Sequence, residues 1–131
     1  MILMADMNTA VSESLRILVV EDDAIVASGL VASLEDVGAS VTWCSNVPDS
    51  LDAIERIAGI DIAIVDYNLD GVISIPVLNR LASLGVSTVL CTGYDASSID
   101  EKFRMLPRVE KPFTRRALHA LLSNWQSSKR T

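Results

Sequence analysis

The sequence predicts an α/β fold, a doubly wound parallel sheet with helices on both faces. Short apolar runs alternate with segments of helical spacing, and the connections between them are short. Three of the runs are uniformly hydrophobic, as strands buried on both faces are. The chain has 131 residues, half of them hydrophobic. That length suits one domain with ample material for a core.

The first strand–helix units lie in the first half of the chain. The run 17–20 predicts a buried strand, and Asp23 behind it is expected to cap a helix over residues 24–37. The more mixed run 41–44 predicts a second strand. Asn46 is expected to begin a second helix, because it stands directly before an apolar pattern of helical spacing.

The second half repeats the alternation. Its predicted elements are, in order, a buried strand over 62–65, a helix from Pro76, a buried strand over 89–91, a weakly patterned helix over 98–104, a short strand over 108–110 and a last helix that Thr114 caps. The three apolar strands are expected at the centre of the sheet and the two more polar ones at its edges. The resulting strand order, 2-1-3-4-5, is that of the flavodoxin-like (βα)5 fold.

The charge of the chain is unevenly distributed. The net charge is −6, yet residues 1–101 sum to −13 and residues 102–131 to +7. An acidic body argues against nonspecific nucleic-acid binding. The basic end has two open interpretations, a docking patch for an acidic partner or a solvated helix face.

Composition also bears on the compartment and on metals. No apolar run is long enough to span a membrane and no secretory signal is recognisable, so a cytoplasmic protein without membrane association is expected. Cys44 and Cys91 suit buried free thiols in a reducing compartment. A single histidine, His119, makes transition-metal catalysis improbable and is expected at the surface. Trp43 and Trp125 are interpreted as packing residues.

Polar side chains follow successive predicted strands. Glu21 and Asp22 follow the first strand, Asp66 the third, Thr92 the fourth and Lys111 the fifth. Ligands bind at the carboxyl ends of the strands in such sheets. Because neighbouring strands lie about 4.8 Å apart, the carboxylates must crowd and repel one another. A raised pKa on one acid or a bound divalent cation would relieve the repulsion, and a carboxylate-rich oxygen site suits Mg²⁺.

This combination of groups indicates phosphoryl chemistry. The Asp66 carboxylate would attack phosphorus, while Thr92 and Lys111 would each hold a phosphoryl oxygen. A single Asp at a strand end is more often a helix cap or a solvated turn, and Asp23 is expected to be such a cap. The joint placement at four strand ends is the stronger signal.

Four stretches resemble the receiver domain of two-component response regulators: residues 16–23, 61–69, 92–93 and 110–113. The resemblance covers about residues 15–127, with 1–14 expected as a flexible arm and 128–131 as a tail. It implies a bacterial signalling protein in which Asp66 accepts a phosphoryl group from a phosphohistidine of a sensor histidine kinase.

The resemblance also implies roles for the surrounding residues. Asp22, Asp66 and the Asn68 backbone carbonyl would ligate Mg²⁺, and Glu21 would act mainly through a metal-bound water. Thr92 would carry the switch hydroxyl and Lys111 would pair with the phosphoryl group. The peptide bond between Lys111 and Pro112 is expected to be cis.

Two positions depart from the family pattern. Asp70 stands where the family often has Pro, and Arg108 replaces the usual switch aromatic. The run 90–94 with Pro107 and residues 111–113 resembles the "FAT GUY" subgroup of receivers, which lacks that aromatic. Tyr94 either takes over part of the readout or is an exposed loop aromatic, and both interpretations stay open.

The favoured function is a stand-alone response regulator, a phosphoacceptor rather than an enzyme. It would act by contact with an unknown downstream protein, or as a phosphate sink or shuttle. The expected partner is a sensor histidine kinase or phosphotransfer protein, and the expected state is a monomer or weak homodimer. The alternatives are a Mg²⁺-dependent phosphohydrolase and a phosphorylation-independent pseudo-receiver that acts as a binding module.

Overall fold

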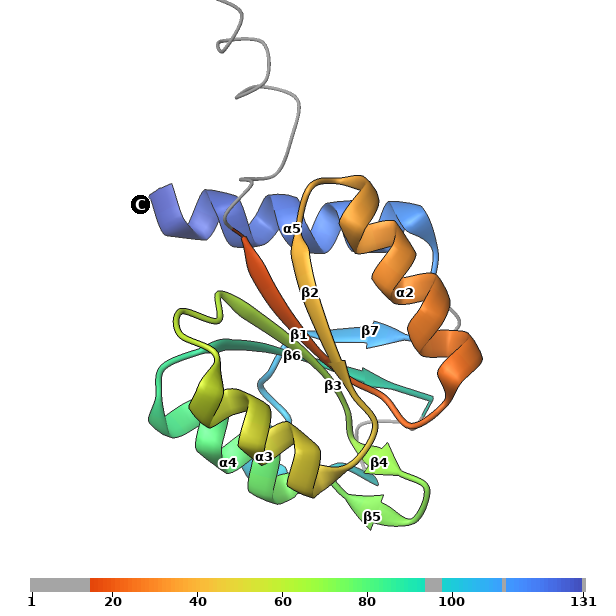
Figure 1. Cartoon of the computed structure of the whole chain (residues 1–131), viewed down its shortest axis with the longest axis vertical. Helices are drawn as coiled ribbons and strands as arrows, with labels where there is room; N and C mark the ends of the chain where they lie inside the picture. The colour runs from red at the N-terminus through yellow and green to blue at the C-terminus, as the bar shows by residue number, and fades with distance from the viewer. Residues whose placement is uncertain (1–14, 94–97, 112, 131) are drawn as a thin grey trace, which may run out of the picture.

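The computed structural model describes residues 15–93, 98–111 and 113–130. The main sheet is parallel and contains, in chain order, β1 (Arg16–Val20), β2 (Ser40–Cys44), β3 (Ile62–Asp66), β6 (Ser87–Thr92) and β7 (Arg108–Glu110). The helices are α2 (Ala24–Asp36), α3 (Val47–Arg56), α4 (Ile75–Ser83) and α5 (Arg115–Arg130). The spatial order is β2-β1-β3-β6-β7. This confirms the predicted 2-1-3-4-5 arrangement of the flavodoxin-like fold (Figure 1).

Side-chain caps begin α2, α3 and α5 where the sequence predicts them. The Asp23 carboxylate accepts hydrogen bonds from the first backbone N–H groups of α2, at 2.9 and 3.2 Å. Asn46 caps α3 by accepting from the Asp49 N–H at 2.9 Å. Thr114 caps α5 by accepting from the Ala117 N–H at 3.0 Å. Each cap satisfies a backbone donor that has no partner within the helix.

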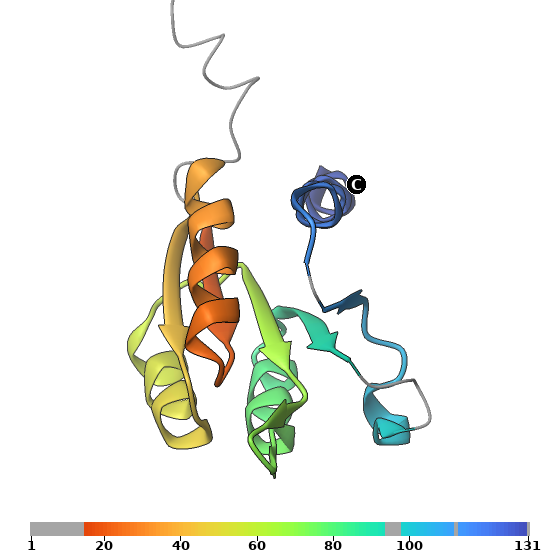
Figure 2. The same ribbon diagram turned by 90° about the vertical axis from the view of Figure 1, so that its right-hand side faces the viewer.

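The core has two layers, one on each face of the sheet. Alternate residues along each central strand point to opposite faces. Leu18, Val65 and Leu90 pack beneath α3 and α4, which lie side by side. Residues of the opposite parity, among them Val19 and Ile64, pack in the layer of α2 and α5. These two helices lie on one side of the sheet, and α3 and α4 lie on the other (Figure 2). Burial on both faces explains why these strands are uniformly apolar.

A short hairpin after β3 was not predicted. Its strands are β4 (Asn68–Leu69) and β5 (Val72–Ile73), paired antiparallel. Asp70 and Gly71 connect them with φ angles of 52° and 91°. Positive φ at both central residues is the geometry of a type I′ turn, and Asp-Gly is a preferred sequence for it. The dipeptide therefore carried a hairpin signal.

Within the expected helix over residues 98–104, the structure has the short 3-10 helix η2 (Glu101–Phe103) and no α-helix. The Asp100 carboxylate caps it by accepting from the Lys102 N–H at 3.0 Å. Ile99 and Phe103 anchor the segment in the core. With only two apolar anchors, the segment does not present the continuous stripe that a longer helix needs. Tyr94 lies outside the described residues.

Two further expectations concern the chain ends. α5 continues through Arg130, so residues 128–130, expected to be part of a tail, are helical. The expected N-terminal arm, residues 1–14, lies outside the described residues. Among the described residues, no helix combines the length and apolar character that crossing a membrane requires.

Candidate functional site

Five of the predicted site residues line one cavity at the carboxyl edge of the sheet: Glu21, Asp22, Asp66, Asn68 and Lys111. Asp66 is the last residue of β3 and is paired in register with Cys91 of β6. Glu21 follows β1, and its backbone N–H donates to the Cys44 carbonyl at 3.1 Å. Lys111 follows β7. Glu21 is 1% exposed and Asp66 is 5% exposed, so both carboxylates are withdrawn from bulk water.

The acid cluster consists of Glu21, Asp22 and Asp66. Each offers one carboxylate oxygen, and these oxygens lie within 4.8 Å of one another. Asp23 uses its carboxylate to cap α2, as predicted. The cluster therefore places three acids within the span of one cation, as the strand spacing predicts.

Lys111 is the counter-charge of this cluster. Its ammonium nitrogen donates a hydrogen bond to Asp66 Oδ2 at 2.7 Å and lies 2.7 Å from Glu21 Oε1. Burial opposes the ammonium charge, but the hydrogen bonds and charges of Asp66 and Glu21 outweigh it and raise the pKa of Lys111. Sequence reasoning considered a raised acid pKa or a metal as relief for the repulsion. The structure adds this third source, an internal cation.

The two carboxylate oxygens of Glu21 differ in their partners. Oε2 accepts a hydrogen bond from the Asp23 N–H at 3.1 Å. Oε1 is buried and forms an ion pair with the Lys111 ammonium at 2.7 Å. The cluster thus sets three acidic side chains against one ammonium, so a bound cation would offset further negative charge. The oxygen-only donor set fits a hard divalent cation such as Mg²⁺.

Asn68 joins the site to the hairpin. Its backbone N–H donates to Asp66 Oδ1 at 3.2 Å, and its side-chain Oδ1 accepts from the Gly71 N–H at 2.7 Å. The hairpin thus forms one wall of an open cavity of about 550 Å³. The residues that line the cavity are Glu21, Asp22, Asp23, Asp66, Asn68, Asp70, Gly71, Gly93 and Lys111.

Thr92 ends β6 and is 2% exposed. It follows Cys91, the register partner of Asp66, by one residue. The alternation of the strand therefore places Thr92 on the face beneath α3 and α4. Asp66 and Cys91 lie on the opposite face. Thr92 is therefore not among the residues that line the acidic cavity, although its neighbour Gly93 is.

Tyr67, which sequence reasoning named only within a motif, links the site to the η2 segment. It is 5% exposed and packs in the core beneath α3 and α4. Its phenol oxygen accepts a hydrogen bond from the Asp100 N–H at 2.9 Å. Tyr67, directly after Asp66, therefore fixes the chain beyond β6 through this hydrogen bond. An aromatic within an otherwise apolar strand end gave no signal of this role.

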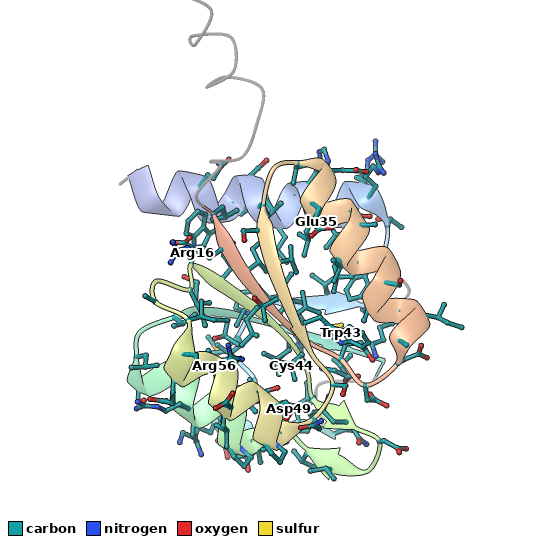
Figure 3. All side chains as sticks on the ribbon, viewed as in Figure 1. Arg16, Glu35, Trp43, Cys44, Asp49 and Arg56 are labelled. Atoms are coloured by element: carbon teal, nitrogen blue, oxygen red, sulfur yellow. The ribbon has the colours of Figure 1, made fainter. Side chains whose placement is uncertain are left out.

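The two tryptophans have different roles. Trp125 is half-buried against the α2–α5 layer, which confirms its interpretation as a packing residue. Trp43 differs, because it is 42% exposed and its indole N–H donates to the Glu21 carbonyl at 2.7 Å (Figure 3). His119 is exposed and both cysteines are buried and free, as predicted.

Four basic side chains in the C-terminal part of the chain have partners within the protein. Lys102 donates to Asn79, Arg104 to the Ile99 carbonyl and Arg115 to Asp36. Lys111 points into the acidic site. These local partners favour the interpretation of a solvated helix face with individual contacts.

Comparisons with known proteins agree with this geometry. The profile of the family described as response regulator receiver domain matches residues 17–123. The chain is similar to the solution structure of SdrG from Sphingomonas melonis Fr1, with 34% identity, a TM-score of 0.76 and coverage of 88% of this chain and 99% of that one. It is also similar to the BeF3-activated conformation of SdrG from Pseudomonas melonis Fr1, with 37% identity, a TM-score of 0.68 and coverage of 85% and 99%.

Two further matches are more distant. The CheY-like receiver domain from Methylobacillus flagellatus shares the fold at 22% identity, with a TM-score of 0.74 and coverage of 86% of this chain and 98% of that one. Sensor protein TorS of Escherichia coli (strain K12) is 28% identical over 119 residues, which are 86% of this chain and 13% of TorS. This chain therefore spans only a small part of that relative. The profile match and the similarity to SdrG show that the chain belongs to the response regulator receiver domains of two-component systems.

Proposed function

We propose that this receiver accepts a phosphoryl group on Asp66 from a phosphohistidine, in a reaction that requires Mg²⁺. The observation that carries the proposal is the setting of the Asp66 carboxylate. It is nearly buried, bonded to the Lys111 ammonium at 2.7 Å, and within one cation's span of Glu21 and Asp22. A carboxylate in this setting is a nucleophile surrounded by groups that stabilise phosphoryl charge.

The transfer assigns a role to each group of the site. An Asp66 carboxylate oxygen forms the new bond to phosphorus as the donor's phosphorus–nitrogen bond breaks, and the imidazole leaves with the electron pair. Lys111 then pairs with a phosphoryl oxygen, and the Thr92 hydroxyl donates to another. Glu21, Asp22, Asp66 and the Asn68 carbonyl would hold Mg²⁺. When bound, the ion screens the carboxylates and the phosphoryl oxygens from one another.

Two relatives support the donor and the modification. A protein 37% identical to this chain has a BeF3-activated conformation, and BeF3 on a carboxylate imitates a phosphoryl group. TorS, a sensor protein, contains a segment similar to this chain. We therefore propose a sensor histidine kinase or a phosphotransfer protein as the phosphoryl donor.

The output is proposed to be protein contact with a downstream target, or service as a phosphate sink or shuttle. We propose that residues 15–127 act as one receiver domain, a phosphoacceptor rather than an enzyme. Buried free Cys44 and Cys91 suit the reducing cytoplasm, where we place the protein. A phosphohydrolase of the haloacid dehalogenase type is less well supported, because Asn68 stands where a second aspartate would be required.

Radiolabelled phosphotransfer tests the proposal. Three proteins are compared: the wild type, Asp66→Asn and Asp70→Asn. In one assay each is incubated with Mg²⁺ and acetyl phosphate, and in a second assay with Mg²⁺ and phosphorylated histidine kinases. Asp70→Asn is the matched control, because Asp70 lines the same cavity and Asn tolerates its positive φ. We expect labelling of the wild type and of Asp70→Asn, and none of Asp66→Asn.

Other outcomes identify the alternatives. Equal labelling of Asp66→Asn would contradict the assignment of the acceptor. Steady turnover of a small phosphate ester would support the phosphohydrolase instead. Absence of labelling of the wild type, together with absence of a Mg²⁺ effect on the amide spectrum near Asp66, would support a pseudo-receiver.

A further inference from the structure

Trp43 engages the acidic site through its polar atom. The indole N–H donates to the Glu21 carbonyl oxygen at 2.7 Å. The ring lies at edge strand β2, on the side of the sheet that α2 covers, and remains 42% exposed (Figure 3). Burial of the rest of the ring stabilises the fold in proportion to the area removed from water. The hydrogen bond adds a direct contact between Trp43 and the backbone of the acidic site.

Residues of strand β2 form hydrogen bonds with both the backbone N–H and the backbone carbonyl of Glu21. The paired register of β1 and β2 ends at Val20 and Cys44. Beyond it, the Glu21 N–H donates to the Cys44 carbonyl at 3.1 Å, and the Glu21 carbonyl accepts from Trp43. An indole N–H is a donor only, so it can engage a carbonyl but cannot compete for the Glu21 N–H.

The peptide group that the indole holds joins Glu21 to Asp22. Both residues contribute to the acid cluster with Asp66, in which the oxygens lie within 4.8 Å. Like charges at this distance repel. Rotation of this single peptide group would turn Asp22 away from Asp66 and relieve the repulsion. A carbonyl fixed by Trp43 opposes that rotation.

We propose that Trp43 is a positioning residue for cation binding, because its indole N–H keeps the Glu21–Asp22 peptide in the orientation that groups the three acids. The inference rests on the proposed function, since the cation is the Mg²⁺ that Glu21, Asp22 and Asp66 would hold. Trp43 contributes no ligand atom. It acts through the backbone of two residues that do.

The test compares Trp43→Phe with Trp125→Phe in the full chain. Phe keeps an aromatic ring and removes the N–H. Trp125 is the matched control, because its indole N–H donates to Ser87 at 3.2 Å. Ser87 is the first residue of β6, at the end of the strand away from the acidic site. Mg²⁺ affinity is measured by NMR titration of the backbone amides of residues 20–23, and folding is checked by urea unfolding of each variant.

We expect Mg²⁺ affinity to fall about fivefold in Trp43→Phe, the change set by one hydrogen bond. Affinity should remain unchanged in Trp125→Phe. In the wild type without Mg²⁺, we expect the Trp43 indole proton to exchange with solvent more slowly than its 42% exposure alone implies. This exchange measurement tests the hydrogen bond without any cation or variant.

Three results would overturn the inference. They are rapid exchange of the Trp43 indole proton, unchanged Mg²⁺ affinity in Trp43→Phe, and an equal loss of affinity in both variants. Failure of the proposed function is distinguishable, because it would appear as absence of Mg²⁺ binding in the wild type while the Trp43 indole proton remained protected.

Discussion

The Lys111 ammonium and Glu21 Oε1 lie 2.7 Å apart, and the same nitrogen donates to Asp66 Oδ2 at 2.7 Å. One side chain thus bridges two carboxylates that approach from neighbouring strands. The lysine side chain is 24% exposed, whereas that of Glu21 is 1% exposed. The charge balance of the site therefore depends on a residue that solvent can reach.

Replacing Lys111 by Met is expected to lower the free energy of unfolding by about 1–3 kcal/mol, because Glu21 and Asp66 lose their shared cation. This figure lies below the roughly 3–5 kcal/mol for breaking a fully buried pair, since the lysine is partly solvated. Mg²⁺ should restore more stability to the variant than it adds to the wild type. Urea unfolding with and without millimolar Mg²⁺ measures both effects.

The control for this experiment is Arg115→Met. Arg115 pairs with Asp36 at 3.0 Å on the surface, where their side chains are 67% and 60% exposed. Its loss should change stability by less than about 1 kcal/mol and should not respond to Mg²⁺. Equal behaviour of the two variants would contradict the role assigned to Lys111.

Cys91 predicts a dependence of stability on alkaline pH. The thiol is 1% exposed, and burial raises its pKa above the ordinary value of 9.0. The folded state therefore keeps the proton that the unfolded state loses. The contribution of the protonated thiol to the free energy of unfolding is complete below pH 9.0. It declines as the pH rises above that value, by at most about 1.4 kcal/mol per pH unit.

Urea unfolding at pH 8 and pH 10 measures this loss in the wild type and in Cys91→Ala. Lysine and tyrosine ionisation affects both proteins, so the difference between their slopes isolates the thiol. We expect a steeper decline in the wild type. Parallel slopes would mean that Cys91 ionises equally well in the folded state.

Backbone conformation predicts opposite effects on stability for an alanine at Gly71, in the hairpin, and at Gly29, in α2. Gly71 has a φ of 91°, so Gly71→Ala should destabilise the protein by about 1–2 kcal/mol. Gly29 lies within α2 with open space at its Cβ position, so Gly29→Ala should stabilise the protein by about 0.5–1 kcal/mol. Thermal unfolding of the two variants measures both signs. Equal effects would contradict the type I′ turn at Asp70 and Gly71.

Tyr67→Phe is expected to loosen the segment after β6. The substitution removes the oxygen that accepts from the Asp100 N–H at 2.9 Å, at a cost of about 0.5–1.5 kcal/mol. Amide hydrogen exchange should accelerate at Asp100 and through Phe103, while the amides of β1 keep their protection. Uniform acceleration over the whole chain would instead indicate a general loss of stability.

Several parts of the site followed from the sequence because they depend on local periodicity and on strand spacing. The apolar runs predicted the buried strands, and their order placed Glu21, Asp22 and Asp66 at one edge. Asp23 was predicted as a cap, because a helical pattern begins directly after it. The implied residue roles, the FAT GUY subgroup and the cis peptide at Lys111 remain predictions, and Pro112 lies outside the described residues.

The tertiary structure decided what periodicity cannot express. Lys111 was predicted to meet a phosphoryl oxygen, but its long side chain has several rotatable bonds, and only the positions of Glu21 and Asp66 determine its partners within the protein. Trp43 lies on an edge strand. There, the alternation of polar and apolar residues does not predict whether the ring packs in the core or donates a hydrogen bond. The sequence alone thus determined the fold and the grouping of the acids, and the folded arrangement decided which cation and which donor hold them. The physical reason is that strand order fixes where backbones end, whereas hydrogen bonds between distant side chains depend on geometry within a few tenths of an ångström.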